Sequence, residues 1–360
     1  MIRLVKFAAW QIIIAGIIIF QFSCKKSGTD SQNTNPPPPN PPVTKKWVVS
    51  TFAGSGQPGS TDAKGTQAEF YKPKRTATDS KGNIYVTDGD NFQLVIRKID
   101  SSGNVSTYEG STVSSGLPWV GLLSIAFDNQ DNLYAINDYT IYKIIGPHNV
   151  SVFAGGRGYV DGHGTDAKFN FIGYLAGSPS GNIYLADYDL TNQHRIRMMT
   201  PDADVSTINL TDNTGYDDSV HNFLYIFPIT VDQSGNLYIT SNGSNLIKKI
   251  DPQGIATVFA GQDPGFKDGK GTAAQFQGIT GLAADNSGNI FVTEVGNNAI
   301  RKITPDGTVT TIAGTGDGGY LDGDGSAAKF DYPFHLSVTK NGVVYVADYN
   351  NNRIRKIEYK

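Results

Sequence analysis

The repeat that decides the fold is written most plainly at residues 282–314, which read LAADNSGNIFVTEVGNNAIRKITPDGTVTTIAG. This stretch holds four short apolar or β-branched runs, separated by turn residues such as Asn286-Ser287-Gly288 and Pro305-Asp306-Gly307. Runs of this length between Gly, Asn, Asp and Pro predict four antiparallel strands joined by tight turns. A four-stranded unit of this kind is typical of the blade of a β-propeller.

The core of the repeat is Gly-Asn followed by an apolar and an aromatic residue, and it recurs along the chain. Complete or varied copies begin at Gly82, Asp131, Gly181, Gly235, Gly288 and Gly342. They lie about 49 to 54 residues apart, a period typical of propeller blades. The run before each copy is centred on a small residue, as expected where innermost strands converge on an axis: Ala77, Ala126, Ala176, Thr230, Ala283 and Ser337. The sequence therefore predicts an all-β fold, a six-bladed β-propeller of four-stranded blades.

The two ends of the repeat region predict how the ring closes. The sixth copy stops at Lys360 before its fourth strand, and residues 48–54, VVSTFAG, match the missing piece VTTIAG at residues 309–314. We expect the N-terminal strand to complete the last blade, because closure removes the open edges that a linear array would leave. Residues 47–360 would then be one domain.

Residues 344–357, VYVADYNNNRIRKI, resemble the NHL repeat. Six copies cover nearly all of residues 47–360, and the resemblance implies a six-bladed propeller. It does not imply a single activity, because propellers of this type include lactonases, lyases and pure interaction modules.

Residues 1–23 have the layout of a secretory signal. Arg3 and Lys6 precede an uncharged run of about 16 residues, shorter than the ~20 residues of a transmembrane helix. The run ends at Cys24, which resembles a bacterial lipoprotein signal and implies cleavage before Cys24 and acylation of its thiol. Residues 24–46 are rich in Pro, Ser and Asn and predict an extended tether. We therefore expect an exported protein, lipid-anchored to the bacterial cell envelope on its periplasmic face or at the cell surface.

The composition narrows the possible functions. The 41 glycines fit a fold with many tight turns, and the single cysteine excludes an intrachain disulfide framework and a cysteine-based zinc site. A net charge of −3 gives no basic surface for nucleic acid, so no nucleic-acid partner is expected. Neither a Gly-x-Ser-x-Gly elbow nor a phosphate-binding loop motif is present.

The connections between strands predict two unlike faces. Turns between strands one and two, and between three and four, are short, whereas the opposite face carries blade-to-blade loops of roughly 13 to 20 residues. Binding sites usually lie on long loops held by a rigid scaffold, so we expect the ligand on this long-loop face. A motif that begins Asp-Gly recurs in three of these loops, with a degraded fourth copy that begins Asp62-Ala63. We interpret it as a turn, a Thr or Ser N-cap, one helical turn and a Phe plugged between blades. These motifs begin at Asp62, Asp161, Asp268 and Asp322.

Four acidic residues end second strands: Asp88, Asp187, Glu294 and Asp348. A ring of carboxylates could bind a cation such as Ca²⁺, or a polyhydroxyl ligand. Alternatively, each carboxylate could cap its own turn or pair with a nearby arginine such as Arg97, Arg301 or Arg355.

The residue just before each innermost strand should lie at the rim of the central channel. The repeat favours a small residue or Pro there, yet Arg75, Tyr174 and His335 are large and polar. Trp119, in a blade-to-blade loop of the same face, could add a stacking surface. These four are candidate ligand-binding residues; alternatively, they only plug the channel. NHL-like amidating lyases hold zinc with three histidines at this position, and only His335 matches, so that zinc site is not expected.

Two functions remain open at this point, beside a purely structural role in a surface assembly. The first is a binding or interaction module that recognises an envelope protein, a peptide or a glycan through its long-loop face. The second is a calcium-dependent lactonase or related hydrolase resembling the gluconolactonases, with its site at the channel mouth. That resemblance implies calcium ligands of the kind that Glu294, Asn137 and Asp348 could supply.

Overall fold

The structure is a computed structural model that describes residues 44–89, 94–110, 122–147, 149–188, 194–212, 226–241 and 245–360. Residues 45–360 form one compact unit. The predicted signal segment, Cys24 and nearly all of the tether lie outside the described residues. No helix within the described ranges is long and apolar enough to cross a membrane.

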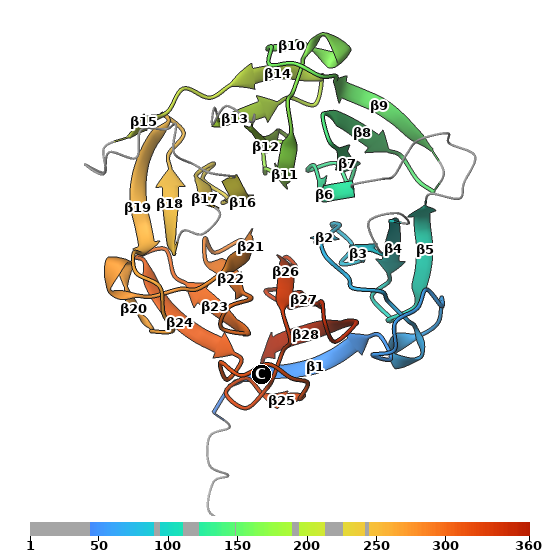
Figure 1. Cartoon of the computed structure of the whole chain (residues 1–360), viewed down its shortest axis with the longest axis vertical. Coiled ribbons are helices and arrows are strands. Elements are labelled where there is room, and N and C mark those ends of the chain that lie inside the picture. The colour runs from blue at the N-terminus through green and yellow to red at the C-terminus, as the bar shows by residue number, and fades with distance from the viewer. Residues whose placement is uncertain are drawn as a thin grey trace, which may run out of the picture. The chain divides into compact units, whose positions relative to one another are not determined.

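The described residues form six sheets arranged in a ring around an open centre (Figure 1). All of their strand pairs are antiparallel except one short outer pair in the fourth blade, Thr211–Asp212 with Ile255–Gly261, which is parallel. The first blade comprises β2 (Thr76–Thr78), β3 (Ile84–Asp88), β4 (Val95–Ile99) and β5 (Val105–Gly110). The second comprises β6 (Leu122–Phe127), β7 (Leu133–Asn137), β8 (Thr140–Ile144) and β9 (Val150–Gly155). The third comprises β11 (Ile172–Gly177), β12 (Ile183–Tyr188), β13 (His194–Met199) and β14 (Asp204–Thr207).

The remaining three blades follow the same order from the centre outward. The fourth comprises β16 (Ile226–Val231), β17 (Leu237–Ser241), β18 (Leu246–Ile250) and β19 (Ile255–Gly261). The fifth comprises β21 (Ile279–Ala284), β22 (Ile290–Glu294), β23 (Ala299–Ile303) and β24 (Thr308–Ala313). The sixth comprises β26 (Pro333–Val338), β27 (Val344–Asp348), β28 (Arg353–Tyr359) and, on the outside, β1 (Trp47–Ala53). The predicted six-bladed propeller is confirmed.

The N-terminal strand completes the last blade, as predicted. β1 pairs antiparallel with β28 in a register that runs from Trp47 opposite Tyr359 to Ala53 opposite Ile354. Lys46 and Lys360 extend the ladder by exchanging two backbone hydrogen bonds of 2.8 and 2.9 Å. Figure 1 shows β1 in blue beside the red C-terminal strands, so the two ends of the propeller close one ring.

Four blades carry a fifth, two-residue outer strand that the four-stranded prediction did not include. These strands are β10 (Gly162–His163), β15 (Thr211–Asp212), β20 (Gly269–Lys270) and β25 (Gly323–Asp324). Three of them belong to the Asp-Gly loops, which lie antiparallel along the outer strand of the blade that they precede. These loops therefore pair with the outer edge of their blades.

Three Asp-Gly loops continue into single 3₁₀ turns, and here the capping prediction is wrong. The turns are η1 (Gly65–Gln67), η2 (Gly164–Asp166) and η3 (Gly271–Ala273). Their N-cap residues are Lys64, His163 and Lys270, none of which caps the turn with its side chain, and the Thr of each motif is the middle residue of its turn. The phenylalanine that ends each motif is fully buried, as predicted: Phe70, Phe169, Phe276 and Phe330.

The apolar core is divided among the six blade-to-blade interfaces. One cluster, for example, joins Tyr134 and Ile136 of the second blade to Leu175 and Leu185 of the third, with Phe169 between them. Five similar clusters fill the other interfaces. Second strands are buried on both faces, which explains why runs such as β3 lack polar alternation.

Candidate functional site

A buried arginine lies between two carboxylates in the sixth blade. Arg355 donates from Nη1 to Asp348 Oδ2 at 2.6 Å and from Nη2 to Asp322 Oδ1 at 2.6 Å. Its side chain is fully buried, and it also donates to the backbone carbonyls of Lys329 and Leu321. Asp322 accepts the backbone N–H of Thr51. One guanidinium thus ties the Asp-Gly loop to three strands of its blade.

The same triad recurs in three other blades. Its members are Asp62–Arg97–Asp88, Asp161–Arg197–Asp187 and Asp268–Arg301–Glu294, with nitrogen–oxygen distances of 2.6 to 3.1 Å. In the second and fourth blades the second strand ends in Asn137 or Ser241, and the arginine position holds Tyr142 or Lys248. Acid and arginine are thus kept together or lost together, as expected of residues that pair with each other.

Burial of these strand-end acids raises the pKa of their carboxyls, and the neighbouring arginines oppose the rise. The pKa is raised to about 6 for Asp88, Asp187 and Asp348, and it is also raised for Glu294. In the loops, burial acts to raise the pKa of Asp161 and Asp268, but hydrogen bonds from Thr207, Thr311 and the arginines outweigh it and lower the pKa.

The structure does not bring the four strand-end acids together. Each lies in its own blade with both oxygens occupied: Asp348 Oδ1 accepts the N–H of Asp331, and Oδ2 accepts from Arg355 and Asn351. Glu294 accepts in the same way from Gln277, Asn297 and Arg301. Within the described ranges, no three His, Cys, Asp or Glu side chains are grouped to hold a metal ion. Calcium therefore does not fit these carboxylates, whose oxygens are already bonded by arginine and backbone donors.

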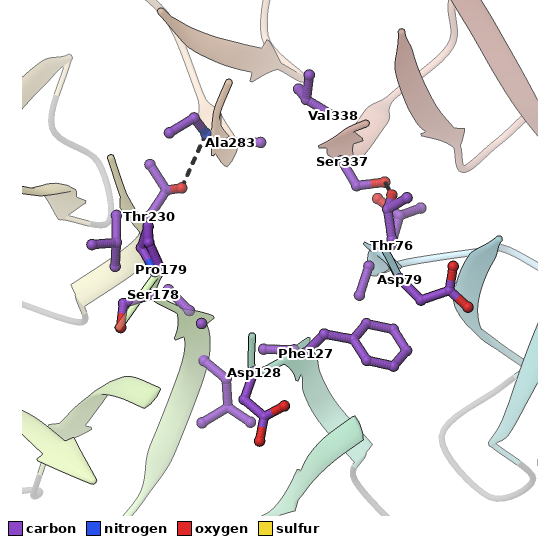
Figure 2. Close-up of a pocket in the computed structure, with 18 of the residues that line it drawn as sticks. Thr76, Asp79, Phe127, Asp128, Ser178, Pro179, Thr230, Ala283, Ser337 and Val338 are labelled. Atoms are coloured by element: carbon purple, nitrogen blue, oxygen red, sulfur yellow. Dashed lines mark hydrogen bonds between the residues drawn. The ribbon is translucent and has the colours of Figure 1, made fainter. Parts of the chain in front are cut away.

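The central channel holds a cavity of about 580 Å³ that reaches the short turns between first and second strands. Figure 2 shows Thr76, Thr230 and Ser337 around its open centre, with Thr230 and Ser337 each hydrogen-bonded to a neighbouring blade. Its wall includes the six small residues that the repeat predicts at the axis. This cavity thus opens on the short-turn face, where loop lengths had not predicted a site.

Four carboxylates in the short turns between first and second strands bond to their own turns, whereas Asp131, which lines the cavity, accepts hydrogen bonds from Ser80 of the first blade. Asp285 Oδ1 accepts the backbone N–H groups of Ser287 and Asn289, and its Oδ2 accepts the Asn289 amide. Asp79, Asp128 and Asp232 repeat this pattern. The repeated Gly-Asn core is therefore explained by turn structure.

Arg75, Tyr174 and His335 meet at the other end of the channel. The Arg75 guanidinium lies 3.9 Å from the centre of the Tyr174 ring and 4.7 Å from that of Phe334, and it donates to the Thr280 carbonyl at 3.3 Å. His335 Nδ1 accepts the N–H of Thr76 at 3.3 Å. Burial, reinforced by Arg75, holds the pKa of His335 well below its usual value, so the ring is neutral. Arg75 of the first blade thus packs on Tyr174 of the third, and His335 joins the sixth blade to the first through Thr76.

A second cavity of about 300 Å³ lies on the long-loop face, at the junction of the first and sixth blades. It is lined by Lys74, Tyr332, Phe334, Tyr349 and Asn350. The Tyr332 and Phe334 rings are stacked at 6.0 Å with an interplanar angle of 20°, and Tyr349 lies 5.6 and 5.7 Å from them. We call this the aromatic pocket. Phe334 joins it to the residues at this end of the channel, because the same ring contacts Arg75.

The aromatic pocket was not predicted from the sequence, although the residues at positions 72 and 332 are unusual for their backbone conformation. Tyr332 and Lys72 occupy the position that follows the buried Phe by two residues, where the fifth blade has Gly278. All three have positive φ, at 60°, 56° and 68°. Lys72 and Tyr332 are thus large side chains in a backbone conformation suited to glycine. Trp119, the fourth predicted rim residue, lies outside the described residues.

Comparison with known proteins supports the resemblance to NHL-repeat propellers. An NHL repeat model matches residues 330–357. SUPPRESSOR OF QUENCHING 1, a chloroplastic protein of Arabidopsis thaliana, is 36% identical over 132 residues, which cover 34% of this chain and 12% of that protein. The chain spans about an eighth of the length of such curated relatives.

Solved structures share the fold at low identity. An auxiliary nutrient binding protein from Bacteroides ovatus superposes with a TM-score of 0.68 at 20% identity, covering 88% of this chain and 78% of that one. A putative gluconolactonase superposes with a TM-score of 0.57 at 12% identity, covering 89% and 93%. At these identities the likeness extends to the propeller architecture alone.

Proposed function

We propose that this chain is a lipid-anchored binding module of the bacterial cell envelope, and that it binds a saccharide in the aromatic pocket of its long-loop face. The observation that carries the proposal is the grouping of Tyr332, Phe334 and Tyr349 around one cavity, with Lys74 and Asn350 at its side. Aromatic faces cover the apolar faces of a sugar ring, and polar side chains reach its hydroxyls.

We choose this pocket over the channel by comparing which residues recur from blade to blade in each place. Four channel-mouth carboxylates follow one turn pattern in four blades, which is a structural role. In the aromatic pocket, the contact of Tyr332 with Tyr349 has a counterpart in Phe171 and Tyr188 of the third blade, at 4.6 Å. The third ring, Phe334, has no such counterpart, because the third blade has Gly173 at that position. A solved neighbour described as an auxiliary nutrient binding protein is consistent with ligand binding by such a propeller. The occupied oxygens of Glu294 and Asp348 favour this function over a calcium-dependent lactonase.

The test is binding of the full chain to a panel of neutral and acidic oligosaccharides. We expect binding by the wild type, a loss of about tenfold or more in Tyr349→Ala, and no change in Tyr320→Ala, because central aromatic contacts carry much of a binding energy. Tyr320 is a matched control, 45% exposed and stacked on Arg353 at 3.9 Å. EDTA should leave binding unchanged. If no oligosaccharide of the panel binds and the protein hydrolyses lactones in a chelator-sensitive way, the proposal is wrong and the lactonase is favoured.

Lipid anchoring through Cys24 is a separate part of the proposal, supported by the signal layout and the Pro-rich segment after it. In cells fed an alkyne-labelled fatty acid, we expect the wild type to be labelled and to sediment with membranes. Cys24→Ala should lose the label and leave the membrane fraction. An unlabelled wild type, or a Cys24→Ala protein that is still labelled, would contradict the anchor.

A further inference from the structure

The geometry points to an acidic saccharide, one that carries carboxylates, as the ligand of the aromatic pocket, with Lys72 and Tyr332 as its specificity-determining residues. This inference rests on the proposed function and names the ligand class of the same site.

Cationic groups gather at this pocket. Lys74 lines it, and Lys72 Nζ lies 5.5 Å from the centre of the Tyr349 ring and 5.9 Å from that of Tyr71. Arg75 lies below, against Phe334. On the acidic side, Asp331 accepts a hydrogen bond from Asn350 at 2.8 Å, and Asp88 is committed to Arg97. Among the described residues, the Lys72 ammonium has only ring contacts, and its positive charge favours a negatively charged ligand.

The backbone gives an independent argument. Lys72 and Tyr332 are held in the left-handed region, at φ of 56° and 60°, where a bulky side chain is disfavoured. The neighbouring blade imposes this conformation: Asn352 Oδ1 accepts the N–H of Lys72, and Asn298 Oδ1 accepts that of Tyr332, each at 2.9 Å. A glycine would satisfy both bonds, as the conformation of Gly278 in the fifth blade indicates. Side chains kept at disfavoured backbone positions are characteristic of functional sites.

Lys72 and Tyr332 would make different contacts with the saccharide. Tyr332 is 40% exposed and presents a ring beside those of Phe334 and Tyr349. Lys72 is exposed, and within the described part of the chain its ammonium has only ring contacts. The tyrosine therefore offers a stacking face, and the lysine offers a cation for a carboxylate bound on that face.

The experiment is isothermal titration calorimetry of the full chain with oligogalacturonides and oligoglucuronates, each beside its carboxyl-reduced neutral form. We expect the acidic form to bind at least tenfold more tightly, with an advantage that shrinks between 50 and 500 mM NaCl. Lys72→Gly and Tyr332→Gly should each weaken acidic binding about tenfold. Their melting temperatures should stay within about 2 °C of the wild type, because relief of the left-handed strain offsets the added freedom of the unfolded chain.

Lys340→Ala is the matched control, because it removes an exposed lysine at the channel on the opposite face. It should bind like the wild type. Neutral forms that bind as tightly as acidic ones, or a Lys72→Gly protein with unchanged affinity, would overturn the acidic ligand and leave the proposed binding function standing. Failure of every acidic and neutral sugar, here and in the wider panel, would defeat both.

Discussion

Replacing Arg355 with Met should lower the stability of the propeller by about 3 to 5 kcal/mol, the usual cost of removing one partner from a buried ion pair. Arg355 contacts the fully buried Asp348 and two backbone carbonyls that would lose their donor. For a domain of this size the loss corresponds to a fall of roughly 6 to 15 °C in melting temperature, measured by calorimetry.

The neighbouring residue supplies the control. Lys356 lies on the same strand, but it pairs with Glu358 where both side chains are partly exposed, so Lys356→Met should cost less than about 1 kcal/mol. Adding Asp348→Asn to Arg355→Met should recover part of the loss, because it removes the carboxylate left without its arginine. Equal melting temperatures for Arg355→Met and Lys356→Met would refute the structural role of the triads.

Deleting residues 47–54 should destabilise the whole propeller, with a fall of more than about 15 °C or loss of the cooperative transition. The deletion removes β1, which lies between β25 and β28 and buries Val49 and Ala53. Its loss exposes the ladder edge of β28 and opens the ring.

An eight-residue deletion in the preceding Pro-rich segment, residues 35–42, is the control of equal length and should leave the melting temperature unchanged. Such a result would assign the effect to ring closure and not to a shortened chain. A 47–54 deletion that melts like the wild type would contradict closure by the N-terminal strand.

The fold could be predicted in detail because its determinants are local and repeated. Three sequence patterns recur from blade to blade, and each has one physical explanation. They are the small residues at the axis, the second strands without polar alternation and the Gly-Asn turns. Three of the four two-residue outer strands could not be predicted, because they depend on where an Asp-Gly loop lies against a neighbouring strand. That position depends on contacts such as that of the buried Arg301 with the half-exposed Asp268.

The site was harder to predict for a related reason. The acids at the ends of the second strands are visible in sequence, but only the register of β27 and β28 shows that Asp348 lies beside Arg355 and not beside the other acids. Arg75, Tyr174 and His335 lie near the axis, and the structure adds that Arg75 packs on Tyr174. Tyr332 and Tyr349 lie 17 residues apart on different loops, and only the fold brings their rings within 5.6 Å.

A crystal structure of the full chain with a bound acidic oligosaccharide tests the central claim most directly. We predict density for a sugar ring over Tyr332, Phe334 and Tyr349, with a carboxylate within reach of Lys72 or Lys74. Density for the sugar in the central channel beside His335, or a metal ion on Asp348 with the sugar bound to it, would contradict the assignment of the site.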